Sequence, residues 1–366
     1  MGNKMQPRSI CAGKFVLKSI IGKGGMGVVY LGYDTSLERH VAIKLLHPTL
    51  TENEHFKERF HYEAIAMARL NHPNIVTVHD KIEIDEENLY GIVMEVVDGK
   101  DLRSVIDERK GALNLKEALN ISTQVLTALN TAHQQGIIHR DVKPNNIMIT
   151  NNNQVKVMDF GIAMLLGAKR LTACGDAFGT PHYMSPEQIM TPLDIDHRTD
   201  VYSFGIVMFE MLTGNLPFDS DSEYLIKNAH IETMPPKLTD LNNQLPLWLN
   251  DVMWKALAKD RDDRFVGCGE YLEFIENKYH NQVKESEPKD SRSKFIDESL
   301  PVGRVCSICF QVLAFENSIC DFDGGSMENA SPINSIDVLK CIKCKKRFSN
   351  MINYCPDDGS KLQKLS

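Results

Sequence analysis

The first hundred residues alternate between short β-branched runs and turn-forming residues. Residues 15–46 hold three such runs, which are separated by "GKGGMG" and "YDTSLER" and predict three strands. Residues 74–97 predict two more strands. Between them, residues 51–70 predict a helix, because large apolar residues recur every three or four positions. The chain is therefore expected to open with a β-rich lobe that carries one helix.

From residue 101 onward, apolar residues recur mainly at helical spacing. The predicted helices cover residues 101–106, 116–135, 200–213, 247–258 and 268–280. Residues 281–304 are polar, charged and poor in apolar side chains, which predicts a flexible linker. A larger helical lobe, a linker and a separate unit over residues 305–366 are therefore expected.

The length and charge of the chain limit the number of domains and the kinds of partner that can be expected. The 366 residues are too many for one ordinary core and predict two or more domains. A net charge of −8 gives no electrostatic case for nucleic acid or an anionic membrane as a partner. No apolar run approaches the roughly 18 residues that span a bilayer. The first ten residues lack the apolar core of a signal peptide. We expect a cytoplasmic protein without membrane insertion.

Six of the nine cysteines lie in the last 61 residues, and they belong to a repeat. Residues 306–327 and 341–362 align without a gap as C-x2-C-x10-C-x2-D-G, with a period of 35 residues. Each copy supplies three thiols and one carboxylate, the number of ligands that closes a tetrahedral zinc site. The predicted zinc ligands are Cys306, Cys309, Cys320, Asp323, Cys341, Cys344, Cys355 and Asp358.

The two repeats resemble zinc ribbons, in which "CPxCG" stands where this chain has "CPDDG". We expect two structural zinc sites. A single site made by the four cysteines of the two C-x2-C pairs is the alternative, and reduced cysteines in an unfolded tail are the simplest reading. Residues 301–366 carry eight Lys or Arg and seven Asp or Glu, so a protein partner or autoregulation is favoured over nucleic acid.

A glycine-rich stretch follows the first predicted strand. Gly22, Gly24 and Gly27 form G-x-G-x-x-G, whose backbone N–H groups can approach a phosphate, and Val29 follows them. In dinucleotide-binding folds these glycines open a helix, whereas here they bend between two strands. The motif therefore predicts a phosphate-binding loop of another kind.

Lys44 ends "VAIK" inside an apolar strand. Such a lysine commonly buries its stem and leaves its ammonium in water. A functional role requires a carboxylate that holds the ammonium against phosphates. Glu63 lies on the apolar face of the predicted helix and is the candidate for that partner.

The run "HRDVKPNN" (139–146) places three chemically useful residues close together. Asp141 is a candidate base, Lys143 a cation and Asn146 a metal ligand. Asp159 follows an apolar strand 18 residues after Asp141 and precedes Phe160 and a glycine. A charged surface loop with no catalytic role would not require this order of residues. It would also not require the glycine-rich motif and "VAIK" earlier in the chain.

Taken together, these motifs resemble a protein kinase, and "GGMGVVY" is most similar to bacterial Ser/Thr kinases. The resemblance covers about residues 15–275 and implies an α+β, two-lobed kinase fold over residues 12–280. It implies that Asp141 orients the substrate hydroxyl, that Lys143 neutralises the transferred phosphate, and that Asn146 and Asp159 hold Mg²⁺. The residues that it implies for ATP are Gly22, Gly24, Gly27, Val29, Lys44, and the backbones of Glu95 and Val97, with Met94 beside the adenine.

The resemblance also extends into the helical lobe. "GTPHYMSPE" (179–187) resembles the end of an activation segment, and Arg264 is the implied ion-pair partner of Glu187. "DVYSFG" (200–205) resembles the element that anchors the catalytic loop. Lys143 with Thr180 implies Ser or Thr substrates. Thr172 is the candidate phosphosite that would meet Arg140, or else an ordinary polar loop residue.

The expected function is transfer of the γ-phosphate of ATP to Ser or Thr hydroxyls of proteins, including autophosphorylation. An ATP-binding scaffold that acts through the zinc module is the alternative. The sequence leaves open the substrates, the activating signal, the protein partner of the zinc module, and whether a homodimer carries out trans-autophosphorylation.

Overall fold

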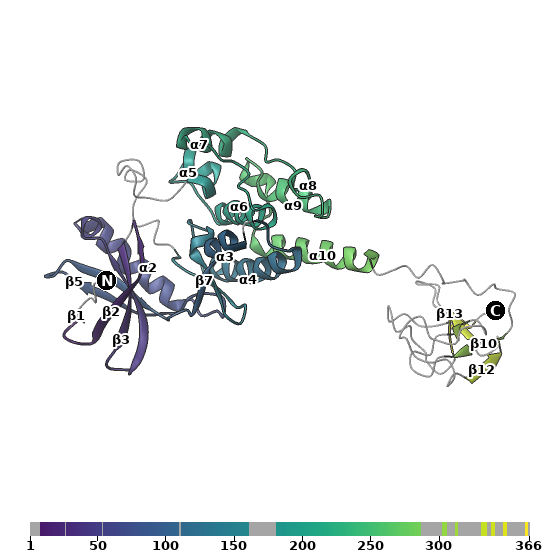
Figure 1. Ribbon diagram of the computed structural model, residues 1–366, viewed down its shortest axis with the longest axis horizontal. Coiled ribbons are helices and arrows are strands. Elements are labelled where there is room, and N and C mark those ends of the chain that lie inside the picture. The colour runs from purple at the N-terminus through teal and green to yellow at the C-terminus, as the bar shows by residue number, and fades with distance from the viewer. Residues whose placement is uncertain are drawn as a thin grey trace. The chain divides into compact units, whose positions relative to one another are not determined.

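The computed structural model describes residues 8–25, 27–52, 54–109, 111–160 and 181–286, and six short strands beyond residue 301. The chain divides into two compact units, Met1–Tyr279 and His280–Ser366. The first unit contains a β-rich lobe followed by a helical lobe (Figure 1).

The β-rich lobe is built on one antiparallel sheet. Its strand order is β1-β2-β3-β4-β6-β5. The three strands predicted in residues 15–46 and the two predicted in residues 74–97 are confirmed, and one short strand precedes them. The strands are β1 (Arg8–Ile10), β2 (Phe15–Gly24), β3 (Gly27–Asp34), β4 (Arg39–Leu46), β5 (Val78–Ile84) and β6 (Leu89–Met94).

Helix α2 (Glu54–Arg69) follows the short helix α1 (Pro48–Thr51). The predicted apolar face of α2 is buried, with Phe56 5% exposed and Phe60 fully buried. The ring of Phe60 meets Tyr90 of β6 edge-on at 5.9 Å between centroids. The helical periodicity of the sequence thus becomes the contact that fixes α2 to the sheet.

Helix α6 (Arg198–Thr213) forms the centre of the helical lobe. All of its residues from Thr199 to Leu212 are buried, so the helix has no solvent-facing side. It ends at Gly214, whose φ of 73° is left-handed and suits glycine. Helices α4 (Leu115–Gln134), α8 (Leu238–Leu241) and α9 (Trp248–Ala256) pack directly against α6. A helix buried on every side gives the lobe a rigid internal support.

The remaining helices complete this lobe. The five helices predicted from periodicity are confirmed with shifts of their ends. Three other helices were missed: two have only four or five residues, and the third, Glu223–Glu232, buries only Ile226 and His230 and so shows a weak apolar period. No helix among the described residues has both the length and the apolar composition to span a membrane. The other helices are α3 (Leu102–Arg109), α5 (Pro186–Met190), α7 (Glu223–Glu232) and α10 (Cys268–Ser286).

A small sheet connects the two lobes. Its strands are β7 (Gly99–Asp101), β8 (Ile147–Thr150) and β9 (Val155–Val157), in the order β7-β8-β9. The backbone of Val157 also bonds to the segment before β5, with Val76 N donating to Val157 O at 3.0 Å. Strand β9 is therefore held from both lobes.

The second unit contains two three-stranded sheets, β11-β10-β12 and β14-β13-β15. Their pairing follows the sequence repeat: Arg304 pairs with Leu313 in the first hairpin, and Leu339 pairs with Phe348 in the second. Both partners are displaced by the period of 35 residues found in the sequence. The strands are β10 (Val302–Val305), β11 (Val312–Leu313), β12 (Ser331–Asn334), β13 (Val338–Lys340), β14 (Arg347–Ser349) and β15 (Gln363–Lys364).

Candidate active site

The loop that carries Asp141 is anchored to the buried helix α6. Asp200 of α6 accepts hydrogen bonds from the backbone N–H groups of His139 and Arg140, both at 2.8 Å. Nε2 of His133 lies 2.7 Å from the same carboxylate. Burial raises the pKa of Asp200, but the contact with His133 and the nearby charges outweigh it and hold the pKa below its ordinary value. The predicted anchoring role of the "DVYSFG" element is confirmed.

Two predicted catalytic residues and one predicted metal ligand meet around the carboxylate of Asp141. Lys143 Nζ lies 2.8 Å from Asp141 Oδ2. Asn146 Nδ2 donates to the same oxygen at 3.0 Å and to the backbone carbonyl of Asp141 at 2.8 Å. Both contacts use Oδ2, and among the described residues no hydrogen bond to Oδ1 is found. The spacing within "HRDVKPNN" thus becomes a compact group of base, cation and amide.

Asp159 joins this group from the end of β9. The N–H of Met158 donates to the carbonyl of Asn146 at 2.9 Å, which brings the two predicted metal ligands together. Asp159 itself adopts a left-handed φ of 60°, an uncommon conformation for a residue with a Cβ. The backbone therefore turns sharply where the predicted ligand is presented.

Lys44 is paired with Asp159 rather than with Glu63. Its Nζ lies 2.7 Å from Asp159 Oδ2, and its side chain is only 9% exposed. Burial raises the pKa of Asp159, but the Lys44 ammonium outweighs it and holds the pKa below its ordinary value. A lysine with its ammonium in water is thereby ruled out for this position.

The predicted pairing of Lys44 with Glu63 is not among the ion pairs of the described residues. Burial raises the pKa of the Glu63 carboxyl, and the nearby Arg140 guanidinium opposes part of that rise. The sequence placed Glu63 on the correct face of α2, but Asp159 already satisfies the ammonium. A catalytic role for Glu63 therefore stays a prediction.

The residue after Asp159 packs into the catalytic loop. Phe160 is buried, and its ring centroid lies 4.6 Å from that of His139. Nε2 of His139 lies 2.7 Å from the carbonyl oxygen of Met158. These contacts fix the end of β9 against the loop that holds Asp141.

The glycine-rich stretch lies between two strands, as predicted. Gly22 and Gly24 belong to β2, and Gly27 begins β3 opposite Gly24. Gly27 has a φ of 154°, and a Cβ built on it would lie 2.0 Å from the carbonyl oxygen of Leu45. The close approach of this backbone to β4 therefore requires glycine at position 27.

An apolar cluster lies between the glycine-rich strands and the segment after β6. It contains buried Ala42, Val76 and Met94, with Val29, Val97 and Met158 packed against them. In the same segment, Glu95 donates its N–H to Thr77 O at 3.0 Å, while its carboxylate accepts from Lys156 at 2.6 Å. Among the described residues, no hydrogen-bond partner is found for the carbonyl of Glu95 or the N–H of Val97. An apolar wall beside one acceptor and one donor suits a planar heterocyclic base.

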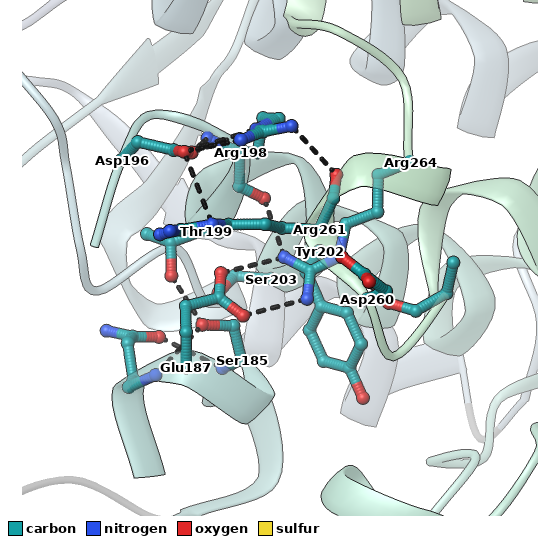
Figure 2. A network of polar contacts seen from close by, with 12 residues as sticks. Ser185, Glu187, Asp196, Arg198, Thr199, Tyr202, Ser203, Asp260, Arg261 and Arg264 are labelled. Carbon is teal, nitrogen blue, oxygen red and sulfur yellow. Dashed lines mark hydrogen bonds and ion pairs between the residues drawn. The ribbon is translucent and has the colours of Figure 1, made fainter. Parts of the chain in front are cut away.

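The predicted pairing of Glu187 with Arg264 is confirmed (Figure 2). The guanidinium donates to both carboxylate oxygens, at 2.7 and 2.8 Å. Burial raises the pKa of Glu187, but Arg264 outweighs it and keeps the pKa below its ordinary value. A bidentate, buried pair of this kind fixes α5 to the helical lobe.

Gln188 is a contact that sequence reasoning missed. Its Nε2 donates to the carbonyl oxygen of Arg140 at 2.8 Å, so α5 touches the catalytic loop directly. The pattern S-x-x-Q at residues 185–188 is a signal for a helix cap. It carries no information about a contact 48 residues away in the chain.

Several predicted residues lie outside the described part of the chain. Thr172, the candidate phosphosite, and Thr180 belong to this group. So do the eight predicted zinc ligands, Cys306, Cys309, Cys320, Asp323, Cys341, Cys344, Cys355 and Asp358.

Known proteins share this arrangement of motifs. Residues 15–277 match the family described as "Protein kinase domain". Over 265 residues the chain is 44% identical to serine/threonine-protein kinase PksC of Streptomyces coelicolor, covering 70% of this chain and 48% of PksC. Over 254 residues it is 41% identical to serine/threonine-protein kinase PrkC of Bacillus subtilis, covering 69% of this chain and 39% of PrkC. The match therefore spans less than half the length of each of these two relatives.

A solved structure agrees with these sequence matches. The kinase domain of PknI from M. tuberculosis superposes with a TM-score of 0.61 at 29% sequence identity. The superposition covers 76% of this chain and 99% of that domain.

Proposed function

Because the chain belongs to the protein kinase domain family, we propose that it transfers the γ-phosphate of ATP to Ser or Thr hydroxyls of proteins. The observation that carries the proposal is the group formed by Asp141, Lys143, Asn146 and Asp159, with Lys44 paired to Asp159. The printed names of PksC and PrkC, both serine/threonine-protein kinases, point to the same chemistry.

The geometry suits phosphoryl transfer, a reaction that depends on positioning and charge more than on covalent catalysis. Asp141 is held by Lys143 and Asn146 through one oxygen, and its other oxygen would orient the attacking hydroxyl. Lys143 would offset charge on the transferred phosphate. Lys44 would hold the nucleotide phosphates from the opposite lobe.

Asn146 and Asp159 fit a Mg²⁺ ion, which prefers oxygen ligands and takes few of them from the protein. Asn146 uses its Nδ2 to donate to Asp141, so the amide oxygen is the atom left for a cation. Asp159 is kept ionised by Lys44. When bound, Mg²⁺ would neutralise negative charge on the phosphates.

The apolar cluster around Met94 would receive the adenine of ATP. Val29 and Ala42 lie on its glycine-rich side, and Val97 lies on the side of the segment after β6. The carbonyl of Glu95 and the N–H of Val97 would bind the edge of the base. The glycines of β2 and β3 would bring backbone N–H groups to the phosphates.

Incorporation of labelled γ-phosphate tests this proposal. The purified full chain is incubated with Mg-ATP and a generic protein substrate, with Asp141→Asn as the matched control. Label on Ser and Thr in the wild type, with none in Asp141→Asn, is the expected result. A wild type that binds ATP but transfers no label would overturn the proposal in favour of a scaffold.

We further propose autophosphorylation, with Thr172 as the leading site and Arg140 as its partner. Support comes from the position of Arg140 beside the base and from its burial, which lowers its pKa and favours a counter-anion. Mapping of labelled residues tests the site. A labelling rate per enzyme molecule that rises with enzyme concentration would indicate transfer between copies. A rate per molecule that stays constant would indicate transfer within one chain.

For the second unit we propose two structural zinc sites. The six residues between β10 and β11, and the six between β13 and β14, each contain one C-x2-C pair, so both pairs fall between strands in the same register. Elemental analysis of the full chain should find about two zinc ions per chain, and Cys306→Ser or Cys341→Ser should each remove one. One zinc ion in the wild type and none in either variant would support the shared site, and no zinc in the wild type would overturn both.

We also propose a cytoplasmic location and a protein-binding or autoregulatory role for residues 305–366. Support comes from the nearly balanced charge of this segment and from its thiols, which require a reducing compartment. Deletion of residues 301–366 should change the phosphorylation rate, the bound proteins or the location. No change in any of the three would contradict the role.

A further inference from the structure

Arg140, the residue before the catalytic base, has a strained backbone. Its φ is 67°, in the left-handed region that residues with a Cβ seldom adopt. Such a conformation is unfavourable and persists only where neighbouring groups hold it. The direction in which Asp141 points depends on it, because Arg140 and Asp141 share one peptide group.

Two hydrogen bonds hold Arg140 from opposite sides. Asp200 accepts from its N–H at 2.8 Å, and Gln188 Nε2 donates to its carbonyl oxygen at 2.8 Å. The second bond acts on the peptide group that leads to Asp141. Among the described residues, Gln188 is the one side chain that bonds to this carbonyl.

Gln188 is itself fixed by a capping box. Its Oε1 accepts from the N–H of Ser185 at 3.0 Å, and its own N–H donates to Ser185 Oγ at 3.3 Å. The amide therefore uses its oxygen for the helix cap and its nitrogen for the catalytic loop.

Helix α5, which carries Gln188, is held in place by contacts with buried residues of the helical lobe. Figure 2 shows Ser185 beside Thr199, to which its hydroxyl is hydrogen-bonded, and Glu187 paired with Arg264. Ser185, Thr199 and Arg264 are all buried. The end of the activation segment is thus attached to the core and reaches the catalytic loop through one side chain.

We propose that Gln188 is a positioning residue for Asp141, which holds the strained Arg140 peptide through its donated hydrogen bond. This inference rests on the proposed kinase activity. It assigns to the amide nitrogen a role that the helix cap alone does not require.

The variant Gln188→Glu separates the two roles. A glutamate keeps the shape and the capping-box acceptor, since S-x-x-E is itself a favoured capping box. It has no donor for the carbonyl of Arg140 when ionised, and it places negative charge against that oxygen. The turnover number should fall about tenfold or more, while the KM for ATP and the unfolding midpoint stay close to wild type. Gln244→Glu, on an exposed side chain, is the control for added charge.

The pH profile gives the readout that a purely structural role would not change. Once protonated, the carboxyl of the variant regains an O–H that can donate to the Arg140 carbonyl. The activity of Gln188→Glu relative to wild type should therefore rise as the pH falls from about 6.5 to about 4.5, where an ordinary glutamate begins to be protonated. The charged groups near this carbonyl, which include Glu63, Asp141, Lys143 and Asp200, are the same in both proteins, so taking the ratio removes their common effect on activity.

Each outcome decides the question. A lower turnover number with a ratio that recovers at low pH supports the inference. An unchanged turnover number, or a loss that does not recover and accompanies a lower unfolding midpoint, overturns it. No phosphate transfer by the wild type would instead mean that the proposed function has failed, and nucleotide binding measured on the same sample distinguishes that case.

Discussion

The ammonium of Lys44 lies 2.7 Å from Oδ2 of Asp159, and this ion pair joins strand β4 of the β-rich lobe to the second residue after β9. The lysine side chain is 9% exposed and the aspartate side chain 24% exposed. Each charge therefore depends on the other, since a partly buried ion without a partner is costly. The pair keeps the predicted metal ligand ionised and keeps the predicted phosphate-binding cation in place.

Lys44→Met should greatly reduce phosphate transfer, by about a hundredfold or more. The methionine keeps the length of the side chain but leaves Asp159 without its cation. The pKa of Asp159 should then rise, because Lys44 no longer opposes the effect of its burial. Kinetics of peptide phosphorylation measures the first effect, and Lys44→Arg serves as the control that keeps a charge. Full activity in Lys44→Met would contradict the assignment.

Arg264→Met should lower the free energy of unfolding by about 3–5 kcal/mol, since it leaves the carboxylate of Glu187 buried without a partner. The double variant Glu187→Gln with Arg264→Met should lose less stability than Arg264→Met alone, because no charge is left buried without a partner. Because the pKa of Glu187 is lowered in the folded protein, the pair stabilises above the ordinary glutamate range and loses that effect as the pH falls. Urea unfolding near neutral pH and at acidic pH checks both expectations. Equal stability of the single and double variants would count against the pair.

Glu63→Gln should stabilise the fold slightly at neutral pH, by less than about 1 kcal/mol. Burial raises the pKa of Glu63, so its ionised form is disfavoured in the folded protein. The protonated Glu63 carboxyl therefore contributes its full stability to the fold below the ordinary glutamate pKa. This contribution is lost as the pH rises through the raised pKa of the folded protein. The gain in Glu63→Gln should disappear near pH 4, where wild type and variant are both neutral. Thermal unfolding across this range is the measurement, and a gain that persists at low pH would refute this explanation.

Gly27→Ala should destabilise the β-rich lobe and weaken nucleotide binding. The added Cβ would lie 2.0 Å from the carbonyl oxygen of Leu45, so β3 and β4 would have to separate. The expected loss of stability is at least about 1–3 kcal/mol. Gly24→Ala is the matched control, since nothing lies within 4 Å of a Cβ at that position. Similar behaviour of both variants in unfolding and nucleotide titration would show that close packing at Gly27 is unimportant.

Local patterns in the sequence were enough to place the main elements and most of the site. The spacing of Asp141, Lys143 and Asn146 within one short loop leaves little freedom, so these residues meet wherever the loop folds. The same holds for the glycines between β2 and β3 and for the apolar face of α2. Helices α5 and α8 were missed because four or five residues cannot display a helical period, and α7 was missed because it buries only Ile226 and His230.

The order of the motifs, the identity of the loop residues and the 35-residue repeat follow from the sequence alone, because each depends on neighbours along the chain. Which distant groups pair with one another depends on the packed fold. Lys44 had two carboxylates within its chemical reach, Glu63 and Asp159, and composition could not rank them. The choice follows from where Asp159 lies relative to β4. In the same way, the bond from Gln188 to Arg140 follows from how Ser185, the N-cap of α5, is bonded to Thr199 of α6. Such contacts depend on distances between elements, which no local pattern of residues encodes.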